Sequence, residues 1–252
     1  MTTVAGYAAK FDSAAGWVAQ ENMTQRGFEA PKRHGLRAAF SDNTEKREMI
    51  SRDLTGLYGF TSDPAIHEVR AVTAVDGRPR GAERALFESA IREGNERARR
   101  TLLEEFDRAS INVSATDFGP LVLLFTKGRQ EDYEFTPAGT ALIGADKVLL
   151  VRYRQKGGPA SLHLKEGSRR ASAVLTGQIE VRESDFAPLR ITLRSERKDV
   201  RDEADVDYLP QSTGLLLPVS IIYRRYVKNE LVAENRSRIS GWRRLDAAGA
   251  GR

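Results

Sequence analysis

The most regular pattern along the chain is an alternation of apolar and polar side chains that recurs through residues 119–241. In residues 189–194, for example, leucine and isoleucine take turns with arginine and threonine. A period of two places every second side chain on the same face of a β-strand. Turn signals such as Pro137 and Gly139 separate these runs about every 8 to 14 residues, a spacing that fits hairpins and excludes crossover helices. The pattern predicts an antiparallel meander with one apolar face and one Arg/Glu face.

Two segments show helical periodicity instead. Residues 83–107 place apolar side chains such as Leu102 and Phe106 on one stripe, with Glu and Arg at i,i+4 spacing on the other side. Residues 5–20 are rich in alanine, with larger apolar side chains at roughly helical spacing. We therefore expect a helix over each segment and a short disordered tail over residues 246–252.

An apolar sheet face must either close on itself or be covered by the helices. The predicted fold class is therefore α+β and mainly antiparallel β: a curved, unclosed β-barrel (a half-barrel) of about 8–11 strands that embraces one or two helices. No Pro/Gly/Ser-rich linker divides the chain, so residues 1–252 are expected to form a single domain. Such a sheet encloses either a filled core or a ligand cavity.

The composition excludes several classes of protein. The 252 residues include 40 Lys and Arg against 35 Asp and Glu, interleaved and not gathered in one patch, which argues against nucleic-acid binding. There is no cysteine, so disulfides and thiolate sites are excluded. No apolar run reaches the roughly 20 residues of a transmembrane helix. The first residues contain no basic and apolar segments typical of a secretory signal, so we expect none in the chain as given.

Candidate catalytic and metal-binding residues are few. His163 and Glu166 are the one close pair of metal-ligand types, and a metal site needs more ligands than two. The acidic residues between 199 and 207 lack the spacing of a calcium loop. There is no Gly-x-Ser-x-Gly, Walker or Gly-x-Gly-x-x-Gly motif. The expectation is a non-enzymatic protein with no metal and no cofactor.

The C-terminal strands resemble those of a known family. Residues 176–191 look like a glycine-led strand and its return strand, and residues 214–239 look like a closing hairpin. Both resemble the lipoprotein-localisation-factor superfamily, which contains the outer-membrane lipoprotein carrier and many bacterial envelope relatives. The resemblance implies an unclosed barrel of about eleven strands with a helical lid, an acyl-binding cavity, and a periplasmic or secreted location. A cytoplasmic location is the alternative.

A ligand-binding face follows from this resemblance together with the alternation. The aromatic and aliphatic side chains of the apolar face are the candidate ligand-binding residues. Tyr153 and Tyr223 are expected at the mouth of the cavity, with buried rings and hydroxyls that reach water. The candidates are Tyr133, Phe135, Leu149, Val151, Tyr153, Leu189, Ile191, Leu193, Ile221 and Tyr223.

Three functions remain open at this point. The first is a non-enzymatic envelope protein that binds a lipid or acyl group, with a lipid or an acylated protein as its partner. The second is a protein-interaction module with a filled core that presents its Arg/Glu face. A hydrolase or a nucleic-acid binder is less favoured, because no motif supports either.

Overall fold

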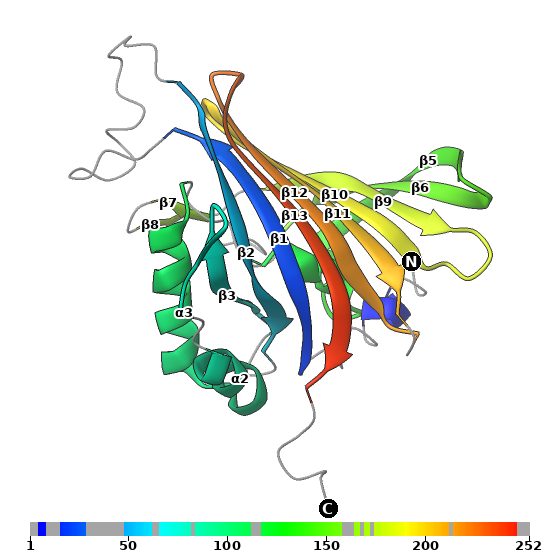
Figure 1. Ribbon diagram of the computed structural model, residues 1–252. Coiled ribbons are helices and arrows are strands. Elements are labelled where there is room, and N and C mark those ends of the chain that lie inside the picture. Colours follow the sequence, from blue (N-terminus) through cyan, green and yellow to red (C-terminus); the bar gives the residue numbers. More distant parts are fainter. Residues whose placement is uncertain are drawn as a thin grey trace, which may run out of the picture.

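The computed structural model describes residues 5–8, 16–28, 48–61, 66–81, 84–111, 117–157, 164–166, 169–171, 174–211 and 214–245. Within these ranges, eleven strands form one antiparallel sheet in the order β4-β3-β2-β1-β13-β12-β11-β10-β9-β6-β5 (Figure 1). The sheet is strongly curved and its two edge strands do not meet, which confirms the predicted half-barrel.

The strands of this sheet have 8 to 15 residues each, except the two-residue β4. They are β1 (Trp17–Gly27), β2 (Ile50–Phe60), β3 (Glu68–Val75), β4 (Arg78–Pro79), β5 (Tyr133–Ile143), β6 (Asp146–Gln155), β9 (Leu175–Arg182), β10 (Pro188–Arg197), β11 (Val200–Pro210), β12 (Leu216–Val227) and β13 (Glu230–Arg244). Strands β7 (Leu164–Glu166) and β8 (Arg169–Ala171) form a separate two-stranded sheet.

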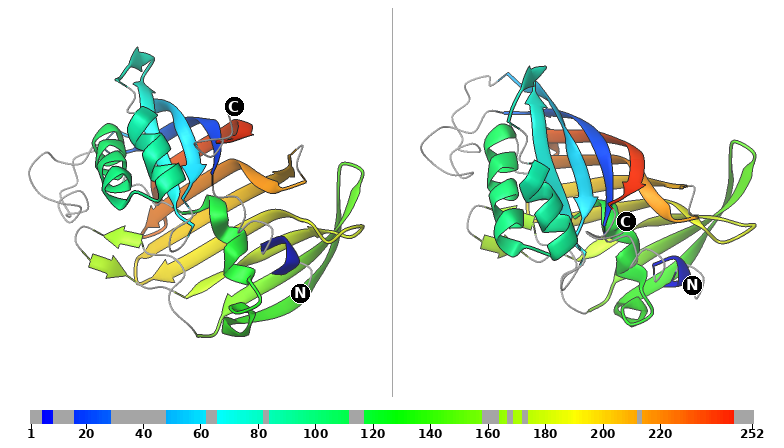
Figure 2. Two further views of the ribbon diagram at one scale, coloured as in Figure 1. Left: turned by 90° about the horizontal axis from the view of Figure 1, so that it is seen from below. Right: turned by 60° about the horizontal axis from the view of Figure 1, so that its bottom comes forward.

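One face of the large sheet, the inner face, is covered by helices. Helices α2 (Arg84–Glu93) and α3 (Glu96–Ala109) pack on β2 and β3, whereas the 3-10 helix η2 (Gly119–Phe125) lies over β10 and β12. A second 3-10 helix, η3 (Gln130–Asp132), leads into β5. Figure 2 shows α2, α3, η2 and the helical turn near the N-terminus on the same side of the sheet. The inner face therefore has two covers, a helix pair at one end and η2 with the N-terminal turn at the other.

The opposite, outer face is a ladder of charged side chains. Arg224 on β12 lies 2.8 Å from Glu234 on β13 and 3.3 Å from Asp205 on β11. Arg190 on β10 continues the row to the same Asp205 at 3.7 Å. Cross-strand pairs of this kind contribute about 0.2–1 kcal/mol each, so the apolar inner face is the larger source of stability.

The N-terminal part differs from the sequence-based expectation. Residues 5–8 are helical, residues 9–15 lie outside the described part, and residues 17–20 belong to β1 and not to a helix. The alternation in β1 is hidden in the sequence because two of its inward positions are the polar residues Glu21 and Gln25. Both are buried, with partners on distant elements.

The predicted helix over residues 83–107 is two helices. Gly94 has a φ of 61°, a left-handed conformation that ends α2. The Asn95 side chain then accepts a hydrogen bond from the Ala98 N–H at 3.1 Å and caps the start of α3. The chain therefore turns here and wraps both helices around one end of the sheet.

The strand meander also has different bounds from those predicted. Residues 119–125 form η2, the strands begin at Tyr133, and β13 ends at Arg244. The seven residues of η2 are nearly all apolar, which resembles a buried strand in the sequence, but they cover the sheet and do not pair within it. The predicted disordered tail at residues 246–252 lies outside the described residues.

Candidate functional site: the inner face under η2

The predicted apolar residues do gather on one surface. Six of the ten candidates are buried, namely Tyr133, Tyr153, Ile191, Leu193, Ile221 and Tyr223. Phe135, Leu149 and Leu189 are partly buried and pack against the same cluster. Val151 is half-buried on β6, directly opposite Ile179 of β9. The strands β5, β6, β9, β10 and β12 thus contribute to one continuous apolar surface.

This surface is covered by the segment that contains η2. Phe118 stacks on Tyr223 with ring centroids 5.1 Å apart, and Phe125 meets the edge of Tyr153 at 4.9 Å. Leu121 and Leu124, between the two phenylalanines, are 2% and 5% exposed. The segment therefore occupies the centre of the inner face in this conformation. Figure 2 shows η2 in green across the yellow and orange strands.

The apolar surface ends in a buried polar group. The Tyr223 hydroxyl donates to Asp202 Oδ1 at 2.6 Å, and Arg225 Nε donates to the same oxygen at 2.7 Å. Arg197 lies 3.8 Å from Asp202 Oδ2. Burial raises the pKa of the Tyr223 hydroxyl well above its ordinary value, and the Asp202 carboxylate adds to that rise. The inner face therefore combines a long apolar surface with a charged end.

The expectation of two tyrosines at a wet cavity mouth is wrong. Tyr153 and Tyr223 are 3% and 2% exposed. The Tyr153 hydroxyl crosses Gly177 of β9 and donates to the Thr192 carbonyl at 2.8 Å. A Cβ at Gly177 would collide with this ring and with that carbonyl, so only glycine permits the crossing. Both hydroxyls make hydrogen bonds within the protein instead.

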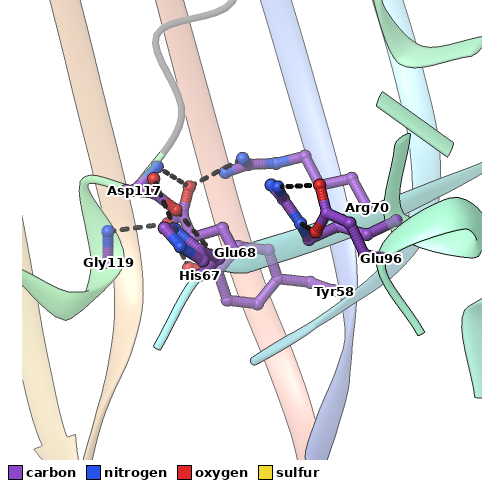
Figure 3. Close-up of polar contacts among 8 residues, drawn as sticks. Tyr58, His67, Glu68, Arg70, Glu96, Asp117 and Gly119 are labelled. Atoms are coloured by element: carbon purple, nitrogen blue, oxygen red, sulfur yellow. Dashed lines mark hydrogen bonds and ion pairs between the residues drawn. The ribbon is translucent and has the colours of Figure 1, made fainter. Parts of the chain in front are cut away.

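A second buried polar group attaches the start of the η2 segment to the sheet. Glu68 of β3 accepts hydrogen bonds from the backbone N–H groups of Asp117 at 2.7 Å and Gly119 at 2.6 Å. It also accepts from the Tyr58 hydroxyl and, at 2.8 Å, from Arg70. Figure 3 shows Glu68 between the backbone of this segment and Arg70. We call Glu21, Tyr58, Glu68 and Arg70 the carboxylate cluster.

The charges of the carboxylate cluster determine the protonation states of Arg70 and Tyr58. Arg70 also donates to Glu21 at 2.8 Å. Burial by itself would lower the pKa of the Arg70 guanidinium, but the two glutamates outweigh burial and raise it well above its ordinary value. Burial, together with the charge of Glu68, raises the pKa of the Tyr58 hydroxyl. Arg70 therefore stays charged and Tyr58 stays a neutral donor, so both keep Glu68 in place.

Other polar contacts reinforce this attachment. His67 Nδ1 lies 3.2 Å from Asp117 Oδ2, and the Glu68 N–H donates to Asp117 Oδ1 at 2.8 Å. The Tyr208 hydroxyl of β11 donates to the Gly119 carbonyl at 2.7 Å. Within the described part of the chain, no group of three His, Asp or Glu side chains lies close enough to hold a metal ion. His34 and His163 lie outside that part.

Sequence reasoning missed the residues that cover the face. The predicted strand meander begins with Leu121, Val122, Leu124 and Phe125, whereas Phe118 belongs to no predicted element. One available signal was the proline at position 120, which a central strand does not tolerate. The carboxylate cluster had no signal at all, because its members lie on three strands that are separate in the sequence.

The comparisons with known proteins concern the fold. No family model and no curated protein matches the chain. Solved structures similar to it include a putative outer membrane lipoprotein-sorting protein domain from Vibrio parahaemolyticus (10% identity, TM-score 0.42, 99% of this chain and 92% of that one). A DUF1329 family protein from Desulfovibrio piger is also similar (10% identity, TM-score 0.41, 100% and 94%).

A further similar structure is a LolA superfamily protein from Nitrosomonas europaea (12% identity, TM-score 0.38, 97% and 94%). These similarities extend over almost the whole chain, and they include the family that the C-terminal strands resemble. No helix in the described ranges is both long enough and apolar enough to cross a bilayer.

Proposed function

We propose that this protein is a non-enzymatic bacterial envelope protein whose inner face binds a lipid or an acyl group, in the periplasm or outside the cell. The proposal rests on how that face is covered. Among the described elements, a seven-residue 3-10 helix, and not a long α-helix, covers strands β10 and β12. Short 3-10 helices have poorer hydrogen-bond geometry than α-helices, so beyond the attachment of its first residues to Glu68 and Tyr208 the segment is held mainly by its apolar side chains.

The side chains of η2 can be exchanged for an acyl chain at a similar free energy. Burial of each of Phe118, Leu121, Val122, Leu124 and Phe125 contributes about 1.5–3 kcal/mol, or about 8–15 kcal/mol in total. A chain of about 16 carbons gains about 0.8 kcal/mol per buried CH₂, or about 13 kcal/mol. The two sums are close, so a ligand can replace the segment without a large net cost.

The polar end of the inner face fits the headgroup of a ligand that carries an acyl chain. Arg197, Asp202 and Arg225 lie where the apolar residues of β10 to β12 end. Guanidinium groups are donors that bind a carboxylate or a phosphate headgroup through charge-assisted hydrogen bonds. An amphipathic ligand would thus meet apolar side chains along its chain and guanidinium groups at its head.

The second candidate function is an interaction module with a filled core, and the burial of the η2 side chains favours it. Truncation of η2 separates the two candidates. In Leu121→Ala and Leu124→Ala, the segment loses apolar contact, so displacement becomes easier and a fluorescent fatty acid should bind about tenfold more tightly or better. The free energy of unfolding without ligand should fall by about 2–5 kcal/mol.

Leu102→Ala is the matched control. Leu102 is 2% exposed, but it belongs to α3 and packs in a separate apolar cluster. The Leu102→Ala variant should lose a similar free energy of unfolding, and its affinity for the fatty acid should be unchanged. If no variant binds the probe and organic extracts of the purified protein contain no acyl chains, the interaction module replaces the proposal.

A further inference from the structure

The outer face carries a hollow at the β5 end of the sheet. It has a volume of about 560 Å³ and lies across β5, β6, β9 and β10, the strands at the β5 edge in Figure 1. Its floor consists of Thr176, Gly177, Gln178 and Thr192, and Tyr153 contributes to the lining from below. Arg152, Arg154 and Arg194 surround the floor, with Glu134 and Thr136 at the β5 side. We call this group the basic hollow.

The register of the strands explains why these residues meet. Arg154 lies directly opposite Thr176 of β9, and Thr176 lies directly opposite Arg194 of β10. Arg152 and Thr192 flank Gln178 in the same way. Small or uncharged side chains on β9 therefore separate arginines on both neighbouring strands. Three guanidinium groups thus surround one site that has hydroxyl and amide groups at its base.

The arginines of the basic hollow differ from those elsewhere on the outer face. Arg190 and Arg224 each make ion pairs with two acidic side chains. Within the described residues, Arg152 and Arg154 make no ion pair, although Glu134 lies opposite Arg154 in the strand register. Among the described residues, Arg194 makes its one ion pair with the exposed Glu196, at 3.4 Å, and it lies opposite Glu203 of β11 in the strand register. An exposed pair of this kind contributes at most about 1 kcal/mol, so an anion can replace Glu196.

We propose that the basic hollow binds a phosphate monoester. Three arginines and one glutamate leave two net positive charges in the lining, and a phosphate monoester carries about −1.5 to −2 at pH 7. Guanidinium forks match phosphate oxygens in pairs. A phosphate monoester offers three terminal oxygens to donors arranged around it, whereas a carboxylate offers two in one plane. The hydroxyl and amide groups of the floor supply further donors.

The site is independent of the acyl-binding function, because it lies on the opposite face of the sheet. The phosphate monoester could belong to a lipid headgroup or to a small soluble molecule. Two arms of one experiment separate these sources. The first titrates glycerol 3-phosphate by calorimetry at low salt. The second measures sedimentation with phosphatidylcholine vesicles that contain phosphatidic acid, against vesicles of equal surface charge that contain phosphatidylglycerol, a diester.

Binding to either monoester source supports the site, and the arm that responds identifies the source. In Arg152→Gln and Arg154→Gln, affinity should fall about tenfold each, since each removes charge-assisted hydrogen bonds. Arg97→Gln is the matched control: Arg97 is an exposed arginine on α3 with no ion pair among the described residues, so the variant loses the same charge without a change in affinity. Thermal melts of all three variants verify that each is folded.

A comparison of phosphate monoesters, a diester and the dicarboxylate succinate on the unmodified protein tests which chemical group the hollow binds. The second pKa of a phosphate monoester is about 6, so affinity should fall as the pH decreases through about 6, whereas a diester shows no such change. The proposal is overturned if neither monoester binds, if succinate or phosphatidylglycerol binds equally well, or if Arg97→Gln weakens binding as much as Arg154→Gln. Tighter binding of an extended Asp/Glu-rich peptide would instead identify the hollow as a protein-docking surface.

Discussion

Two buried glutamates, Glu21 and Glu68, stand at inward positions of β1 and β3 that apolar residues would normally occupy. A buried carboxylate is costly unless a charge and several hydrogen bonds compensate it. Arg70 compensates both, and its guanidinium also lies 4.9 Å from the centre of the Tyr58 ring. The carboxylate cluster therefore depends on a single cation, and the attachment of the η2 segment to Glu68 depends on that cation in turn.

Replacement of this cation should be one of the most damaging single substitutions. Arg70→Ala leaves two carboxylates buried without a positive charge between them, so we expect a loss of about 3–5 kcal/mol in the free energy of unfolding. Urea unfolding measures it. Arg238→Ala, at an exposed position on β13, should stay within about 1 kcal/mol. Equal small losses in both variants would contradict the role of Arg70.

Acid should lower the stability of the folded protein by protonating Glu234 on the outer face. Hydrogen bonds from Arg236, and then from Arg224, lower the pKa of its carboxyl below the ordinary 4.5. A lowered folded-state pKa gives stability that is present above the unfolded pKa and is lost as the pH falls through the folded value. Glu234→Gln should therefore unfold at lower urea than the wild type at pH 7, and the difference should shrink as the pH falls below about 4.5. A difference that grows in acid would have the wrong sign.

At the scale of the elements, Gly94→Ala distinguishes one continuous helix from the observed pair of helices. The two structures predict changes of opposite sign in the free energy of unfolding. If residues 83–107 formed one helix, Gly94→Ala would stabilise it by about 1 kcal/mol. In the observed structure Gly94 has a φ of 61°, so the same change should destabilise the protein by about 1–2 kcal/mol. Gly81→Ala, at an open position without positive φ, is the control and should lie within about 0.5 kcal/mol of the wild type. Thermal melts of both variants decide between the two structures.

The elements also show what the sequence could predict. Strands such as β10 and β12 alternate apolar and charged residues, so their faces could be assigned and most of the candidate residues do meet. Strand β1 could not be recognised, because Gln25 and Glu21 face inward. Their compensating partners, the Ile111 N–H and Arg70, lie far along the chain. Segment η2 could not be placed either, since an apolar run without alternation does not tell a cover from a strand.

For the whole molecule, the decisive pairing joins the first strand to the last. β1 and β13 are neighbours in the middle of the sheet, with Trp17 opposite Arg244 and Gly27 opposite Ala233. Without β13, the remaining strands of the large sheet would form two separate groups, β4-β3-β2-β1 and β12-β11-β10-β9-β6-β5. The inner face extends across this junction, so neither group could cover it alone.

A chain that ends at residue 229 should therefore lack cooperative unfolding, as measured by circular dichroism in urea. A synthetic peptide of residues 230–245, added separately, should restore a single transition, because it supplies the backbone partners of both β1 and β12. A sharp unfolding transition of the truncated chain without the peptide would show that the two groups of strands fold independently.

The pairing of β1 with β13 also delays the completion of the sheet during synthesis. β1 leaves the ribosome first and its partner last, and at about 5–20 residues per second the interval is about 10–45 s. Throughout that time the edge of β1 that later pairs with β13 exposes unpaired N–H and C=O groups that other chains could bind, and β12 adds a second such edge shortly before β13 is made. The complete inner face therefore exists only once β13 has been translated, so a ligand that needs the whole face cannot bind before that point.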